Sequence, residues 1–168
     1  SETPVIAEPW PGAAAALTSK LPPMRLAAPF EALRDAADKA GNPPIFLATI
    51  GPLAQFSARA TFAKSFFEAG GLPALGAEDA HEDDAAIVAA FKRSGAKIAC
   101  LCASDPLYAE RAEAVARALK QAGAVRLYLA GRGGEEEAAY KAAGIDDFIF
   151  AGGDAIAALE DAHRALGL

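Results

Sequence analysis

The sequence predicts a doubly wound α/β domain, built on a five-stranded parallel sheet with helices on both faces. Short apolar runs alternate with stretches of helical periodicity from Pro43 to the end of the chain. Successive runs begin roughly 22 to 28 residues apart, which is the step of a right-handed strand–helix–strand unit. Five strands and five helices in this arrangement favour the flavodoxin-like strand order 2-1-3-4-5. Glycines that suit helix C-termini follow four of the helical stretches, at Gly70, Gly95, Gly123 and Gly144.

The elements of this fold are expected to alternate over residues 43–168, which we treat as one domain. Strands are predicted to begin with the apolar runs, near Ile45, Leu72, Lys97, Val125 and Asp147. Helices are predicted over Ser57–Ala69, Glu82–Ser94, Leu107–Ala122, Glu135–Ala143 and Ala155–Leu166. The first helix has a clear apolar stripe at helical spacing, formed by Phe62, Ala63, Phe66 and Phe67.

Residues 1–42 have a different composition and are predicted to be a Pro/Ala-rich N-terminal arm or linker. Eight of the eleven prolines lie in residues 1–44, so much of this stretch is expected to be extended. One short helix is predicted over Phe30–Ala40, where Phe30, Leu33 and Ala37 share a face. Because the part of the arm from Pro4 to Phe30 has too few apolar anchors to fold alone, we expect contacts outside the α/β core to hold it.

The bulk composition narrows the classes of function. A formal net charge of −6 argues against nucleic acid and anionic membrane surfaces as partners, because both require a basic face. No apolar stretch approaches the roughly 18 residues needed to cross a bilayer. Two cysteines are too few for a disulfide framework and are expected to be reduced, which favours a cytoplasmic protein. Since the chain starts at Ser1 without an initiator methionine, we expect the natural protein to be longer.

The carboxyl ends of the predicted strands are where an open α/β sheet binds ligands, and they carry little chemistry. The first strand ends in Ile50-Gly51-Pro52, and the predicted loop up to Arg59 has none of the acidic residues with which a phosphorelay receiver holds Mg²⁺. Only Thr49 and Ser57 offer hydroxyls for a flavin phosphate, and no G-x-G-x-x-G motif follows the strand. We therefore predict no catalytic residue and no metal site in this chain.

The histidines and cysteines have structural interpretations. His81 lies among acidic residues and is expected on a solvated loop, whereas His163 is expected to pack at the edge of the apolar face of the last helix. Neither has the neighbouring ligands that zinc requires. Cys100 and Cys102 are two residues apart in a predicted strand. This spacing favours buried packing over a redox pair, because a redox C-x-x-C begins a helix.

Two features at later strand ends keep a binding role open. Arg132 is a lone cation between two glycines, suited to a phosphate or to a carboxylate of a partner. The pairs Gly133-Gly134 and Gly152-Gly153 leave room for a large group or another chain to approach the backbone, although ordinary tight turns would use them too. The run Glu135–Glu137 opens a helix, where negative charge is favourable, and needs no further role.

Four segments carry a resemblance to a known family: Ile45–Gly51, Ala60–Ala63, Ala130-Gly131 and Phe150–Gly153. Through them, residues 43–168 resemble the cobalamin-binding domain at the C-terminus of methylmalonyl-CoA mutase and its relatives. In that family the first loop carries Asp-x-His-x-x-Gly, whose histidine is the lower ligand to cobalt and whose aspartate orients it. The corresponding residues are Leu53, Gln55 and Ala58, so the resemblance implies a degenerate cobalamin-binding-like domain without a cofactor of its own.

The loss of all three motif positions resembles the small, non-catalytic subunit of heterodimeric bacterial methylmalonyl-CoA mutases. In those enzymes the large subunit binds adenosylcobalamin and interconverts methylmalonyl-CoA and succinyl-CoA, and it would be the partner. The segment Leu21–Glu31 resembles the linker that joins the family's barrel domain to this one. Under this interpretation a fragment without the barrel is open to self-association. A vestigial cleft is expected at Gly51, Gly131, Gly152 and Gly153.

Two other functions remain open on the sequence alone. One is a cobalamin-binding carrier or sensor that holds the cofactor base-on or through another contact. The other is an independent flavin or thiol oxidoreductase. The dividing features are Gln55 in place of a histidine, and a C-x-C strand in place of a C-x-x-C that begins a helix. A purified carrier would be pink or red, a flavoprotein yellow, and a non-binding subunit colourless.

Overall fold

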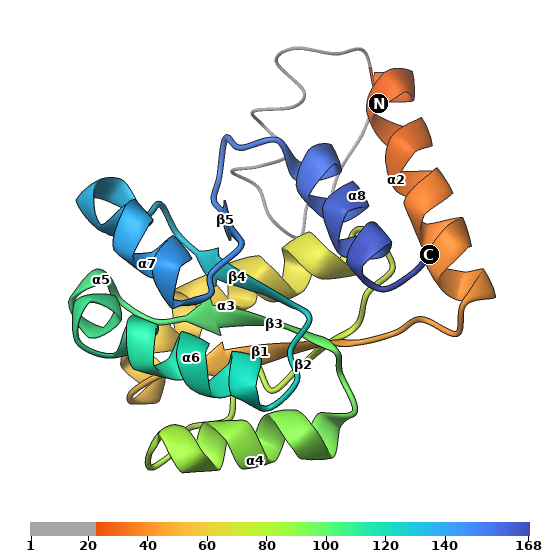
Figure 1. The fold of residues 1–168 in the computed structure, drawn as a ribbon. Coiled ribbons are helices and arrows are strands. Elements are labelled where there is room, and N and C mark those ends of the chain that lie inside the picture. The colour runs from red at the N-terminus through yellow and green to blue at the C-terminus, as the bar shows by residue number, and fades with distance from the viewer. Residues whose placement is uncertain (1–22) are drawn as a thin grey trace.

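The computed structural model describes residues 23–168 and contains the predicted parallel sheet (Figure 1). Its strands are β1 (Ile45–Thr49), β2 (Ala74–Leu75), β3 (Ile98–Cys102), β4 (Arg126–Ala130) and β5 (Asp147–Ile149). They lie in the order β2-β1-β3-β4-β5, and every neighbouring pair is parallel. The flavodoxin-like fold class is therefore confirmed. Predictions for residues 1–22, the first part of the arm, fall outside the described residues.

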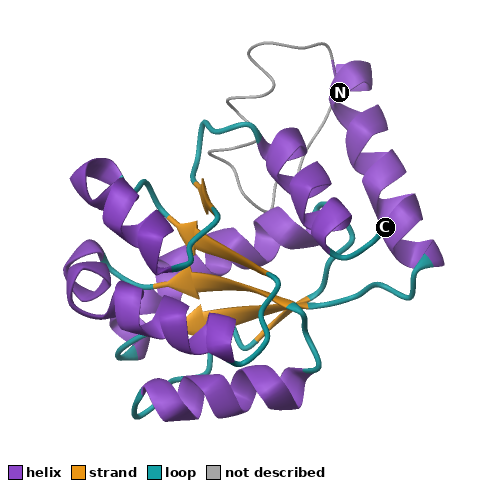
Figure 2. Cartoon of the chain, in the orientation of Figure 1, coloured by secondary structure: helices purple, strands orange, loops and turns teal. Residues whose placement is uncertain are grey.

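Helices cover both faces of the sheet (Figure 2). On one face lie α2 (Pro23–Lys39), α3 (Leu53–Glu68) and α8 (Ala155–Ala165). On the other lie α4 (Asp84–Ser94), α6 (Glu113–Gln121) and α7 (Glu137–Ala143). Three short turns complete the set: α5 (Asp105–Leu107), a π-helical turn (Tyr108–Ala112) and a 3₁₀ turn (Gly134–Glu136). None of the described helices is long and apolar enough to span a membrane.

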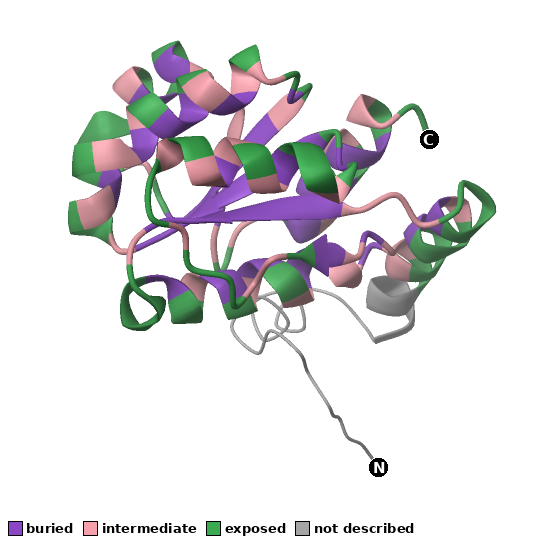
Figure 3. Cartoon of the chain, turned by 90° about the horizontal axis from the view of Figure 1, so that it is seen from below, coloured by how far each residue is buried: buried purple, intermediate pink, exposed green. Residues whose placement is uncertain are grey.

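A separate core lies on each face of the sheet, because alternate strand residues point to opposite sides. On β1, Ile45 and Leu47 belong to the core under α3 and α8, whereas Phe46 and Ala48 belong to the core under α4 and α6. Every residue of β1 and β3 is buried, as the central strands in Figure 3 show. Burial on both faces explains why these strands are continuous apolar runs in the sequence rather than alternating ones.

Helix α2 begins earlier than predicted, at Pro23 instead of Phe30, and it contains Pro29. Proline suits the first position of a helix because its φ is already helical and its missing N–H would be unpaired there. The predicted apolar face is nevertheless correct: Leu33 and Ala37 are buried, and α2 packs against α8 (Figure 1). Periodicity therefore located the face of this helix, while the prolines concealed its start.

Helix α3 also begins earlier than predicted, at Leu53 instead of Ser57. Pro52 precedes it in an extended conformation, with φ −75° and ψ 158°, and good helix formers follow at once. The connection after β1 is therefore only residues 50–52, which is shorter than the loop that the sequence predicted. As a consequence, the three positions that correspond to the cobalamin motif lie on a helix.

Candidate functional site

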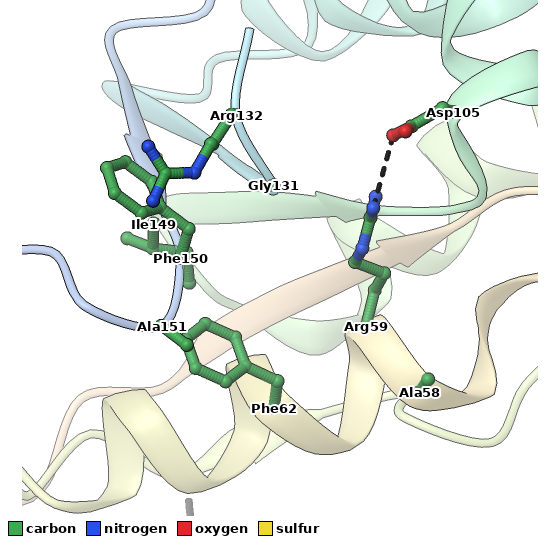
Figure 4. Close-up of a pocket in the computed structure, with 9 residues that line it drawn as sticks. All are labelled: Ala58, Arg59, Phe62, Asp105, Gly131, Arg132, Ile149, Phe150 and Ala151. Atoms are coloured by element: carbon green, nitrogen blue, oxygen red, sulfur yellow. Dashed lines mark hydrogen bonds and ion pairs between the residues drawn. The ribbon is translucent and has the colours of Figure 1, made fainter. Parts of the chain in front are cut away.

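The carboxyl edge of the sheet contains a hollow of about 440 Å³, which we call the strand-end hollow (Figure 4). It opens between α3 and the ends of β4 and β5, at the edge where open α/β sheets bind ligands. Two guanidinium groups and two phenylalanine rings contribute to its wall. Its lining residues are Ala58, Arg59, Phe62, Asp105, Gly131, Arg132, Ile149, Phe150 and Ala151.

The three motif positions occupy the first turns of α3, and only one of them reaches the strand-end hollow. Ala58 lines it, whereas Leu53 and Gln55 lie on the exposed start of the helix, with Leu53 51% exposed. A leucine, an amide and a methyl group are what these positions offer. The start of α3 therefore presents neither an imidazole to a metal nor a carboxylate to orient one.

Arg59, one residue beyond the motif positions, crosses the hollow to the ends of two strands. Its Nη1 donates hydrogen bonds to the carbonyl oxygens of Ala103 at 2.9 Å and Ala130 at 3.2 Å. Its Nη2 pairs with the Asp105 carboxylate at 3.1 Å (Figure 4). Burial alone would lower the pKa of this guanidinium, but its contacts with Tyr108 and Asp105 raise that pKa above its ordinary value. The group is therefore a permanent cation.

Tyr108 fills the same edge from the opposite face of the sheet. The π-helical turn, a conformation that is common at functional sites, places this buried ring beneath the Arg59 guanidinium at 5.5 Å. Its hydroxyl accepts a hydrogen bond from the Ala103 N–H at 3.0 Å. The one O–H of this residue lies within donor distance of two carbonyl oxygens, that of Ala130 at 2.7 Å and that of Leu101 at 3.1 Å. Burial raises the pKa of this phenol well above its ordinary value, so it stays protonated.

Most of the glycines expected to mark a vestigial cleft lie against side chains of this domain. A Cβ at Gly131, where φ is +136°, would lie 2.9 Å from Arg59 Nη1. A Cβ at Gly51 would lie 2.5 Å from a methyl group of Leu107. Gly152 has open space around it and a φ of +90°, as a turn requires, while Gly153 lies against Phe150. Side chains of this domain therefore lie close to three of the four positions, and only Gly152 is open.

Arg132 lies on the other side of the strand-end hollow and is exposed. Its guanidinium stacks over the Phe150 ring, 4.3 Å from the ring centre (Figure 4). Nearby, a Cβ at Gly133 would lie 2.7 Å from the Cβ of Glu137, so the space at this glycine is filled by the following helix. The room expected at the Gly133-Gly134 pair is open only at Gly134.

The two histidines lie away from the hollow. His163 is buried, and its Nε2 is 2.9 Å from the Gly70 carbonyl, so it packs at the helix edge as predicted. His81 lies, as predicted, on an exposed loop among acidic residues, but its own side chain is partly buried. Its ring packs 6.3 Å from the Phe46 ring, and its Nε2 is buried without a hydrogen-bond partner among the described residues. Burial lowers the pKa of His81 below its ordinary value.

Both cysteines are free and buried in β3, as predicted. Burial raises the pKa of the Cys100 thiol well above its ordinary value, which opposes a redox role. No group of three or more histidine, cysteine, aspartate or glutamate side chains within residues 23–168 is arranged to hold a metal ion. The sequence reasoning missed Arg59 and Tyr108, and the signal available for Arg59 was its place as the first cation after β1.

Together the fold and this edge define a flavodoxin-like α/β domain in which Arg59 lies across the carboxyl ends of β3 and β4. No protein-family model matches the chain. It is 45% identical over its whole length to the methylmalonyl-CoA mutase small subunit of Streptomyces virginiae. It is 37% identical over 83% of its length to the small subunit of Propionibacterium freudenreichii subsp. shermanii. These matches cover 26% and 22% of the two relatives.

A probable small subunit of Mycobacterium tuberculosis is 33% identical over 87% of the chain and is covered over 24% of its own length. The chain belongs with the methylmalonyl-CoA mutase small subunits and spans about a quarter of the length of the curated relatives that it matches.

Proposed function

We propose that the chain is the degenerate cobalamin-binding-like domain of a methylmalonyl-CoA mutase small subunit, and that it supports a catalytic large subunit without holding the cofactor. The observation that carries this proposal is the start of α3, where exposed Leu53, Gln55 and Ala58 take the positions of the family's Asp-x-His-x-x-Gly motif. Glutamine cannot replace a neutral imidazole as a cobalt ligand. Leucine cannot accept the hydrogen bond that would orient such an imidazole.

The residues at the carboxyl edge do not fit a cobalamin. The sequence has two histidines, and His163 is bonded to Gly70 beyond the far end of α3, while His81 packs on Phe46. The backbone at Gly131, which a ligand would have to approach closely, is covered by Arg59. These contacts support a domain without a cobalamin site. In the proposed complex, adenosylcobalamin and the interconversion of methylmalonyl-CoA and succinyl-CoA belong to the large subunit.

Co-elution with a mutase large subunit tests the supporting role. The chain and a bacterial mutase large subunit, purified separately, are mixed at equal concentration and passed over a size-exclusion column. We expect one peak of larger size than either protein, and a colourless chain when it is run alone. An unrelated flavodoxin-like protein of similar size serves as the control for non-specific association. Separate elution of the two proteins contradicts the proposal, and a chain that is itself pink would favour a carrier.

A further inference from the structure

The contacts around Arg59 describe a binding site that is already occupied. Its guanidinium is held by two backbone carbonyls, a carboxylate and an aromatic face, which come from residues 103–108 and from the end of β4. We propose that the edge between β3 and β4 is a guanidinium site filled by the chain's own Arg59, and that this occupant excludes other ligands. The inference goes beyond the proposed function, because it names the side chain that covers the edge between β3 and β4. Its evidence is the set of Arg59 contacts given above.

The polar groups at this edge suit a cation and not an anion. The carbonyl oxygens of Ala103 and Ala130 and the carboxylate of Asp105 are all acceptors, and they surround N–H donors. Two backbone N–H groups beside the guanidinium are already hydrogen-bonded. The Ala103 N–H donates to the Tyr108 hydroxyl, and the Gly131 N–H donates to the Ile149 carbonyl at 2.8 Å. A phosphate or carboxylate placed here would face acceptors, so this edge rejects it.

Gly131 leaves the space that the Arg59 guanidinium occupies. Its φ of +136° is a conformation that residues with a side chain rarely adopt. A Cβ on this residue would stand 2.9 Å from Nη1 and 3.3 Å from Cζ of Arg59. The flat guanidinium therefore lies against bare backbone at the end of β4. Gly131 and Arg59 act as a pair, in which the glycine supplies the space and the arginine fills it.

Arg132 provides a matched control within the same hollow. It too is an arginine that lines the strand-end hollow, but it is exposed and stacks on Phe150. The side chain of Arg59 is 33% exposed and its guanidinium reaches the strand ends. Its partner Asp105 is 77% exposed, so the ion pair contributes little to the stability of this arrangement. The two hydrogen bonds to the carbonyl oxygens of Ala103 and Ala130 therefore contribute most. Removal of Arg59 should leave a defined vacancy, whereas removal of Arg132 should not.

Chemical rescue of the variant Arg59→Ala tests the inference. The side-chain atoms that this substitution removes correspond to ethylguanidinium, which should enter the vacancy. We expect the substitution to lower Tm by about 5 °C or more. Ethylguanidinium should then raise Tm of the variant in a saturable way, as a ligand of the folded state does. Ethylurea has the same shape without the charge and should not, and neither wild type nor Arg132→Ala should gain stability from ethylguanidinium.

Absence of rescue, or equal rescue by ethylurea, would overturn the inference. If Arg59→Ala does not fold, a second measurement still tests the inference. Gly131→Ala has two costs. The backbone strain from the positive φ is the same with any residue at position 59, whereas the clash with Nη1 arises only when residue 59 is arginine. Gly131→Ala should therefore lower Tm more in wild type than in Arg59→Met, and equal losses would contradict the pairing. Cobalamin binding by the wild type would defeat the proposed function while leaving the rescue result intact, so the two failures are distinguishable.

Discussion

Removal of the Asp161 carboxylate should destabilise the domain by about 2–4 kcal/mol, because this group ties α8 to β4. Its oxygens accept two hydrogen bonds from the Arg126 guanidinium at 2.8 Å each and one from the Tyr128 hydroxyl at 2.7 Å. An exposed ion pair contributes about 0–1 kcal/mol, and breaking a buried one costs about 3–5 kcal/mol. The Asp161 and Arg126 side chains are 20% and 33% exposed, so this pair lies between those limits. Loss of the acceptor for Tyr128 adds about 1 kcal/mol.

Urea unfolding near neutral pH measures this effect as a change in the free energy of unfolding at constant m-value. The matched control is Glu160→Ala, an exposed acidic residue on the same helix, which should change that free energy by less than about 0.5 kcal/mol. A double-mutant cycle with Arg126→Ala isolates the coupling between the two side chains. If Asp161→Ala costs less than about 1 kcal/mol, the reasoning from partial burial is refuted.

Three further predictions concern buried and partly buried side chains. Because burial lowers the pKa of His81 below 6.5 in the folded state, protonation favours unfolding, and stability should fall as the pH drops through about 6.5. The urea midpoint of His81→Gln should fall less than that of wild type over this range, and equal falls would contradict the assignment. A disulfide reagent should modify Cys100 and Cys102 only as fast as the protein unfolds, so rapid modification of the native protein would show that these thiols are accessible. Phe67→Ala should cost about 3–5 kcal/mol in urea unfolding, because the ring is fully buried against Tyr128, and a cost below about 2 kcal/mol would exclude tight packing there.

The sequence was sufficient for the topology because the signals for it are local. Apolar runs, helical stripes and glycines after helices each depend on neighbouring residues, and together they located five strands and the strand order. The starts of α2 and α3 were misplaced because proline was interpreted only as a breaker. At Pro23 it begins a helix, and Pro52 directly precedes one.

The contacts of Arg59 and Tyr108 at the carboxyl edge of the sheet could not be predicted in this way. Arg59 reaches carbonyl groups 44 and 71 residues further along the chain, and Tyr108 reaches one 22 residues away. The local sequence marks Arg59 as the first cation after β1, but it does not mark these distant partners. The π-helical turn that directs Tyr108 toward them also lacks a local signal. The exposed loop around His81 was predicted correctly, but its acidic neighbours in the sequence concealed the contact of its ring with Phe46.

Titration of the wild-type chain with hydroxocobalamin tests the central claim most directly. The claim is that the motif positions at Leu53, Gln55 and Ala58 hold no cobalt ligand and that Arg59 closes the edge beside them. The corrin absorption spectrum should stay unchanged up to about 100 μM protein, while a cobalamin-binding domain that keeps Asp-x-His-x-x-Gly, titrated in parallel, shifts its spectrum. A saturable spectral change with a Kd of about 1 μM would contradict the account.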